Sequence, residues 1–190
     1  MTHHHDTHVY GRPLKITLVL VLVIMAAEII GGFLSNSLAL LSDAGHMLTD
    51  AGAIGLSLFA MNLARRPANA KKTFGYHRAE IMAALANGLI LILLSAFIFY
   101  EAAQRFTDTP QVKSPLMLIV AGIGLVANII GMLLLRQGSG KSLNIKAAFW
   151  HIIGDTLSSV AVIIAGVIIY FTGWYIADPI LAVVIGLVIL

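Results

Sequence analysis

Two segments of the sequence repeat one pattern of polar residues within long apolar runs. HMLTD places His46 four residues before Asp50, and HIIGD places His151 four residues before Asp155. Residues four apart lie above one another on a helix face, so each helix would present one imidazole and one carboxylate along one stripe. Two such helices side by side can bring two nitrogen and two oxygen donors to one point. Zn²⁺ accepts a four-coordinate set of this kind.

The charges of this donor set also balance. An ionisable side chain within a bilayer costs roughly 2.5 to 3.5 kcal/mol on insertion scales. Two carboxylates with two neutral imidazoles cancel the charge of a bound dication, and this offsets the desolvation of the whole group. Two such pairs on separate apolar segments therefore favour a metal or proton site over two structural histidines.

Further polar residues extend both stripes. Asp43 precedes His46 by three residues, and Asn144 and Ser158 lie on the same helix face as the second pair. A polar stripe that faces the interior of a membrane bundle indicates a hydrated pathway. We therefore predict that Asp43, Asn144 and Ser158 line a pathway beside the metal ligands.

The composition indicates the environment of these residues. The 190-residue chain is 59% hydrophobic and 11% charged, and its mean hydropathy is +0.93. A soluble domain of this composition would expose large apolar patches and aggregate. We therefore predict an integral membrane protein. Because the chain has no cysteine, neither disulfides nor thiolate metal sites are available to it.

Apolar runs of about 20 residues are long enough to cross a bilayer core as helices. We expect an all-α, six-transmembrane-helix bundle with spans at 14–34, 38–64, 77–106, 116–135, 144–169 and 178–190. The last run is too short to span a bilayer, and we interpret it as a truncated sixth helix. In this reading residues 1–13 form a cytoplasmic tail, and residues 14–190 form one transmembrane domain.

The distribution of basic residues predicts the topology. If the N-terminus is cytoplasmic, only Arg105 and Lys113 of the twelve lysines and arginines fall on the other side. Cytoplasmic loops carry the excess of such residues. We therefore place both termini in the cytoplasm and the chain in the inner (plasma) membrane as a multi-pass protein. Tyr170, Phe171 and Trp174 would mark the outer interface.

The two pairs must also lie at the same depth. Asp50 lies about 18 Å along its helix from the predicted start, at 1.5 Å per residue. The fifth helix runs in the opposite direction, and Asp155 reaches that depth only if this helix ends near Gly166 or Ile168. We predict this shorter helix.

The N-terminal segment MTHHHDTH contains His3, His4, His5 and His8. Short histidine-rich tracts bind metal weakly. Part of a purification tag is the alternative, but Asp6 interrupts the run, so we favour a native tail that collects metal.

Two acidic residues lie outside these patterns. Glu28 in the first span either lines an outer vestibule or bonds to a neighbouring helix. Asp178, directly before Pro179, is interpreted as an ordinary helix N-terminus with proline in the first turn.

Four segments together resemble the cation diffusion facilitator family, and most of all its bacterial zinc-exporting branch. They are GGFLSNSLALLSDAGHMLTDAG, TFGYHRAEIMAALANGLIL, NIKAAFWHIIGDTLSSV and ADPI. The resemblance covers the chain from about Leu14 onward. It implies a six-helix fold, a homodimer and a tetrahedral transport site of His46, Asp50, His151 and Asp155. It also implies exchange of Zn²⁺ for H⁺ by alternating access. In this family, histidine rather than aspartate at the position of His46 goes with a preference for zinc over cadmium.

Members of this family usually continue past the sixth helix into a cytoplasmic metal-binding domain. This sequence ends at Leu190, and we expect that domain to be absent.

The function predicted from these features is zinc efflux by a transporter, not an enzyme. Zn²⁺ is then the transported substrate, and the other partners are H⁺, membrane lipid and a second copy of the chain, with no nucleic acid. One alternative is a proton-coupled transporter of another divalent cation or of a non-metal substrate, with histidine and aspartate as a relay. Another is an intramembrane metal hydrolase, but this would need an open metal position and a separate base. The sequence contains no HExxH motif to supply them.

Overall fold

The structure is a computed structural model that describes residues 11–64, 78–136 and 143–190, and all regular structure in these ranges is helical. The helices are α1 Gly11–Ser35, α2 Leu38–Ala64, α3 Arg78–Thr107, α4 Ser114–Arg136, α5 Leu143–Thr172 and α6 Ala177–Ile189. The predicted spans agree with these bounds to within one helical turn. The predicted six-helix, all-α architecture is therefore confirmed.

Within the described residues, four of these helices, α1, α3, α4 and α5, contain stretches long and apolar enough to cross a membrane by length and composition. The other two differ for separate reasons. α2 has 27 residues, but Asp43, His46 and Asp50 interrupt its apolar character. α6 is apolar but has only 13 residues. The polar residues of α2 thus lie in a helix surrounded by strongly apolar neighbours.

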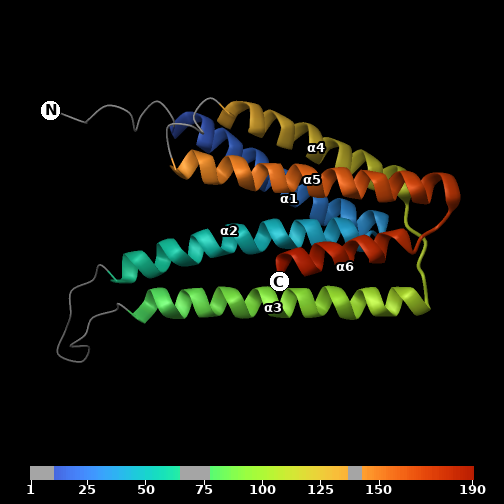
Figure 1. Ribbon diagram of the computed structural model, residues 1–190, viewed down its shortest axis with the longest axis horizontal. Coiled ribbons are helices and arrows are strands. Elements are labelled where there is room, and N and C mark those ends of the chain that lie inside the picture. The colour runs from blue at the N-terminus through green and yellow to red at the C-terminus, as the bar shows by residue number, and fades with distance from the viewer. Residues whose placement is uncertain (1–10, 65–77, 137–142) are drawn as a thin grey trace.

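The helices form two groups of three (Figure 1). α4 packs against α1 and α5 in one group, and α2, α3 and α6 pack against one another in the other. The groups meet where α1 packs against α2 and where α5 packs against α6. α2 and α5 also meet, over a shorter stretch.

Three connections gather at one end of the bundle, on the right in Figure 1. They are the turn between α1 and α2, the segment 108–113 and the segment 173–176. We call this the turn end. The main apolar core lies in this half and includes Leu38, Ile98, Met117, Val162 and Ile185. The helices are therefore packed most extensively on the turn-end side.

The turn between α1 and α2 is tight because two residues satisfy its backbone. Asn36 has a φ of 60°, in the left-handed region that asparagine tolerates better than most residues. Ser37 directly precedes α2, and its Oγ accepts a hydrogen bond from the Leu40 N–H at 3.2 Å, as an N-cap does. The two helices consequently form the predicted antiparallel hairpin.

The prediction that the fifth helix ends near Gly166 or Ile168 is wrong. α5 continues to Thr172, past Gly166 and Ile168, although its histidine–aspartate pair still reaches Asp50. The prediction assumed that α2 starts at the same level at which α5 ends. Instead, the turn before α2 is buried, with Ser37 0% exposed, and α5 extends beyond the start of α2 at the turn end (Figure 1). α2 therefore begins deeper in the bundle than its short connection indicates.

Candidate metal centre

In each predicted pair, the histidine and the aspartate lie one helical turn apart on the same helix. On α2 the His46 Nε2 lies 3.5 Å from Asp50 Oδ2. On α5 the His151 Nε2 lies 3.6 Å from Asp155 Oδ2. Each helix thus presents a nitrogen and an oxygen on the same face, as the four-residue spacing predicts.

The same side chains also meet across the helices. The His151 Nδ1 lies 3.5 Å from Asp50 Oδ2, and the rings of His46 and His151 have centroids 6.2 Å apart. One donor atom each from His46, His151 and Asp155 lies within 4.8 Å of the other two. The structure therefore brings three of the predicted ligands, His46, His151 and Asp155, into one group between α2 and α5. Asp50 lies beside this group and contacts its two histidines.

Three contacts within the cluster are close in length to the distance between neighbouring ligand atoms of a tetrahedral zinc site. Zinc–nitrogen distances of 2.0 to 2.1 Å imply ligand atoms about 3.3 Å apart. The contacts of 3.5 and 3.6 Å approach this value. His151, however, faces one carboxylate with Nδ1 and the other with Nε2, and only one of these nitrogens can coordinate a given ion. Binding of one zinc ion by all four side chains thus requires His151 or the carboxylates to move and the donor atoms, now up to 4.8 Å apart in the group of three, to draw together.

Two atoms of the cluster are buried without a hydrogen-bond partner among the described residues. They are Asp155 Oδ2 and His46 Nδ1. Buried polar atoms are normally hydrogen bonded, and an orphan atom calls for an explanation such as an ion or a water. The orphan carboxylate oxygen is the one that faces His151, and a cation between them would satisfy it.

The four side chains of the cluster differ in their exposure. The side chains of His46, Asp50 and His151 are 28%, 35% and 37% exposed, whereas that of Asp155 is 3% exposed. Asp43, one turn closer to the turn end on α2, is 2% exposed. The buried acids of the cluster region, Asp155 and Asp43, thus lie beside partly exposed ligands.

Two of the predicted pathway residues touch each other. Ser158 on α5 donates a hydrogen bond from its Oγ to Asp43 Oδ1 on α2 at 2.6 Å. This bond links the two ligand-bearing helices on the turn-end side of the cluster. The third predicted residue, Asn144, lies in the first turn of α5, but its side chain is outside the described part of the chain. His3, His4, His5 and His8 also lie outside the described residues.

A second buried polar group lies between α1, α4 and α5. Glu28 is 1% exposed, and Asn128 and Ser159 are 2% and 1% exposed. Asn128 Nδ2 donates to Ser159 Oγ at 3.3 Å, whereas Glu28 Oε2 has no hydrogen-bond partner among the described residues. Glu28 Oε1 lies 3.0 Å from the position a Cβ of Gly124 would take, so the missing side chain of this glycine makes room for the carboxylate.

Glu28 thus faces the bundle interior next to α4, and its bond to a neighbouring helix stays a prediction. Asn128 was not anticipated from the sequence. An amide within the otherwise apolar run of α4 was the available signal.

The reading of Asp178 as an ordinary helix N-terminus is incomplete. The residue does lie in the first turn of α6, but its carboxylate is 0% exposed and serves another helix. It accepts hydrogen bonds from the backbone N–H groups of Leu38 and Ala39 at the start of α2. A contact between residues so far apart in sequence leaves no local signal.

The fold and the paired ligands agree with a comparison of the sequence with known families. A family model for the cation efflux transmembrane domain matches residues 14–190. The chain belongs to this family. The predicted family and a multi-pass membrane protein are thereby confirmed.

Individual relatives of this cation efflux chain are bacterial. It is 47% identical over 193 residues to zinc transporter ZitB of Pectobacterium atrosepticum, with 100% of the chain and 60% of the relative covered. It is 44% identical over 192 residues to the cadmium, cobalt and zinc/H⁺–K⁺ antiporter of Bacillus subtilis, with 100% and 62% covered. It is 47% identical over 190 residues to the metal cation efflux system protein CzcD of Cupriavidus metallidurans, with 99% and 60% covered. The chain thus spans about three fifths of the length of these relatives.

Proposed function

We propose that the chain is the membrane part of a zinc exporter that exchanges Zn²⁺ for H⁺, and that His46, Asp50, His151 and Asp155 form its transport site. The meeting of two His–Asp pairs from α2 and α5 carries this proposal. Two relatives support it by their names, one a zinc transporter and the other an antiporter of cadmium, cobalt and zinc with H⁺ and K⁺.

The chemistry of the four donors couples metal to protons. Metal ligands must be deprotonated, so zinc binding releases protons and acid displaces the metal. Histidine is the side chain suited to carry protons near neutral pH. The two carboxylates neutralise the dication within the membrane, so the loaded site carries no net charge. A proton gradient across the membrane can then drive zinc in the opposite direction.

The exposure of the site indicates which side it faces. Three of the four ligands are partly exposed, while Asp43 and Glu28 toward the turn end are buried. The predicted topology places the turn end outside the cell and the opposite end in the cytoplasm. The conformation is then one in which zinc enters from the cytoplasm, and the Asp43–Ser158 hydrogen bond closes the way out.

The other predicted residues and partners extend this proposal. Asn144, at the start of α5, lies at the cytoplasmic entrance of the pathway. His3, His4, His5 and His8 collect zinc weakly ahead of that entrance. The transporter works in the inner membrane, surrounded by lipid, as a homodimer.

Zinc transport into proteoliposomes tests the proposal. We expect purified chain to move zinc with a pH gradient and to move protons only when zinc is present. Asp155→Asn should abolish both fluxes, whereas Asp108→Asn, an exposed acid in the connection after α3, should leave both unchanged. Zinc transport that persists in Asp155→Asn would contradict the proposed site. Proton flux without zinc would favour the non-metal relay, and hydrolysis without either flux would favour the hydrolase.

A further inference from the structure

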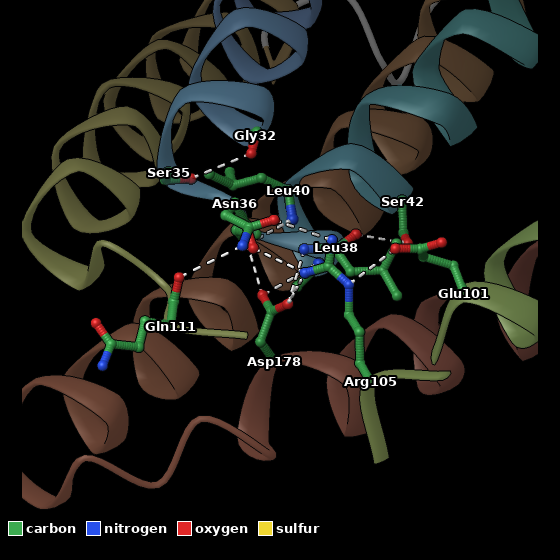
Figure 2. Close-up of polar contacts among 12 residues, drawn as sticks. Gly32, Ser35, Asn36, Leu38, Leu40, Ser42, Glu101, Arg105, Gln111 and Asp178 are labelled. Atoms are coloured by element: carbon green, nitrogen blue, oxygen red, sulfur yellow. Dashed lines mark hydrogen bonds and ion pairs between the residues drawn. The ribbon is translucent and has the colours of Figure 1, made fainter. Parts of the chain in front are cut away.

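A buried ionic cluster holds the start of α2 at the turn end of the bundle. Figure 2 shows Asp178 of α6 and Arg105 of α3 pointing toward the turn between α1 and α2. Asp178 is 0% exposed and Arg105 is 8% exposed. These two side chains come from helices that are distant in sequence, and both converge on the few residues from Asn36 to Ala39. We call this group the α2 anchor.

Asp178 caps α2 from outside. Its Oδ2 accepts a hydrogen bond from the Leu38 N–H at 2.7 Å, and its Oδ1 accepts bonds from the Ala39 N–H at 3.2 Å and the Ser37 Oγ at 2.6 Å. The first N–H groups of a helix have no partner within the helix, and a negative charge is favourable there. The carboxylate of α6 therefore satisfies donors of α2 that the α2 backbone leaves free.

Arg105 compensates the buried charge and fixes the turn. Its Nη1 lies 3.6 Å from Asp178 Oδ2 and donates to the Asn36 carbonyl oxygen at 2.7 Å. Its Nη2 donates to Asn36 Oδ1 at 3.2 Å. Its Nε donates to Glu101 Oε1 at 3.2 Å, one turn earlier on α3. One guanidinium thus joins α3, α6 and the α1–α2 turn.

The anchor lies on the helix that carries two of the proposed ligands. From Leu38 to Asp50 the rise along α2 is about 18 Å. A tilt of about 5° at the anchored end moves Asp50 by roughly 1.5 Å over this length. A zinc site tolerates deviations of only about 0.2 Å in its ligand distances. Together with the packing of α2 against α1, α3 and α6, the anchor therefore constrains where His46 and Asp50 lie.

We propose that Asp178 and Arg105 are positioning residues of the transport site, which act by fixing the turn end of α2 against α3 and α6. This inference rests on the proposed function for its effect on zinc. The place of α2 itself can be measured without zinc, so the two ideas can fail separately.

Two measurements on the full chain in lipid test the anchor. The first is hydrogen–deuterium exchange over residues 36–44, which we expect to become at least about tenfold faster at the start of α2 in Asp178→Asn. The second is the zinc concentration for half-maximal uptake, which we expect to rise about ten- to hundredfold, the range seen when partners of metal ligands are removed. The maximal rate should change less.

Charge variants separate positioning from folding. Arg105→Gln leaves the Asp178 charge buried without its cation and should lower the melting temperature, whereas Arg105→Lys keeps a cation and should lower it less. The double variant Arg105→Gln with Asp178→Asn removes both charges, so we expect its melting temperature to recover. Its zinc requirement should stay raised, because α2 is still not anchored.

The matched control is Glu101→Gln. Its carboxylate is 33% exposed and contacts Arg105 from the same helix, so we expect the zinc requirement to stay within about twofold of wild type. Unchanged exchange at residues 36–44 in Asp178→Asn would overturn the anchor. A double variant that regains the wild-type zinc requirement along with its melting temperature would overturn the positioning role. If the wild type moves no zinc while exchange rises as expected, the proposed function fails and the anchor stands.

Discussion

Ser158→Ala tests whether a single hydrogen bond keeps the turn-end side of the pathway closed. The Ser158 hydroxyl donates to Asp43 Oδ1 at 2.6 Å, and Asp43 is 2% exposed. The bond joins α2 to α5. Among the described residues it is the one hydrogen bond between side chains of these two helices. Removing the hydroxyl leaves a buried carboxylate oxygen without this partner.

The size of the effect follows from the kind of bond that is lost. A hydrogen bond to a charged group contributes about 1.5 to 3 kcal/mol. If the bond exists only while the turn-end side is closed, its loss shifts the balance toward the open state by the same amount. That shift corresponds to about a 10- to 150-fold change in the ratio of the two states.

A cysteine reporter can measure this shift, because the chain contains no cysteine of its own. Ser42→Cys places a thiol on α2 at a position that is 0% exposed, and the native hydroxyl donates only within its own helix, to the Leu38 carbonyl oxygen at 2.8 Å. We expect a membrane-impermeant maleimide, added from outside to intact cells, to label this cysteine at least about tenfold faster in Ser158→Ala.

The matched control removes a hydroxyl from the same helix without touching α2. Thr156 donates to the Ile152 carbonyl oxygen within α5 at 2.6 Å, so Thr156→Ala should leave the labelling rate unchanged. Equal labelling rates in Ser158→Ala and Thr156→Ala would refute the reasoning, because the Asp43–Ser158 bond would then contribute nothing to closure.

The remaining predictions concern metal binding and packing. Zinc at about one hundred times its Kd should stabilise the wild type by about 2.7 kcal/mol, and a melting-temperature shift that persists in His46→Ala would contradict its role as ligand. Zinc affinity should fall as the pH is lowered, since the ligands must lose protons to bind, and calorimetry in buffers of different ionisation enthalpy should detect the released protons. Gly31→Ala should destabilise the fold by about 1 to 3 kcal/mol, because its Cβ would lie 2.6 Å from Val120 Cγ2. Gly122→Ala, with nothing within 4 Å of its Cβ, should stay within about 0.5 kcal/mol in the same denaturation measurement.

Most of the fold and the candidate ligands could be predicted from local sequence patterns. The apolar runs are long enough to define each helix, and a spacing of four residues places His46 above Asp50 without reference to any other helix. The contact between α2 and α5 required a further inference. Each helix supplies only two donors, so a four-coordinate site needs both helices. The contact of His151 with Asp50 at 3.5 Å agrees with that inference.

Relations between helices were the part that the sequence could not supply. The depth argument failed because it depends on where the α1–α2 turn lies, and that turn is buried rather than level with the end of α5. The capping of α2 by Asp178 is equally non-local, because the partner N–H groups belong to a different helix. The surroundings of Glu28 are non-local in the same way, because Gly124 on α4 leaves the space that its carboxylate occupies.

The division of the proposed ligands between two helices has a consequence for the proposed transport. His46 and Asp50 move with α2, whereas His151 and Asp155 move with α5, and these helices meet over a short stretch. A site built on one helix would keep its affinity through any movement of the bundle. A site shared between two helices loses ligands when they separate, so the same movement that opens a path also weakens the hold on the ion. Protons that then occupy the freed imidazoles and carboxylates prevent the ion from rebinding, which is the property that an exchanger requires.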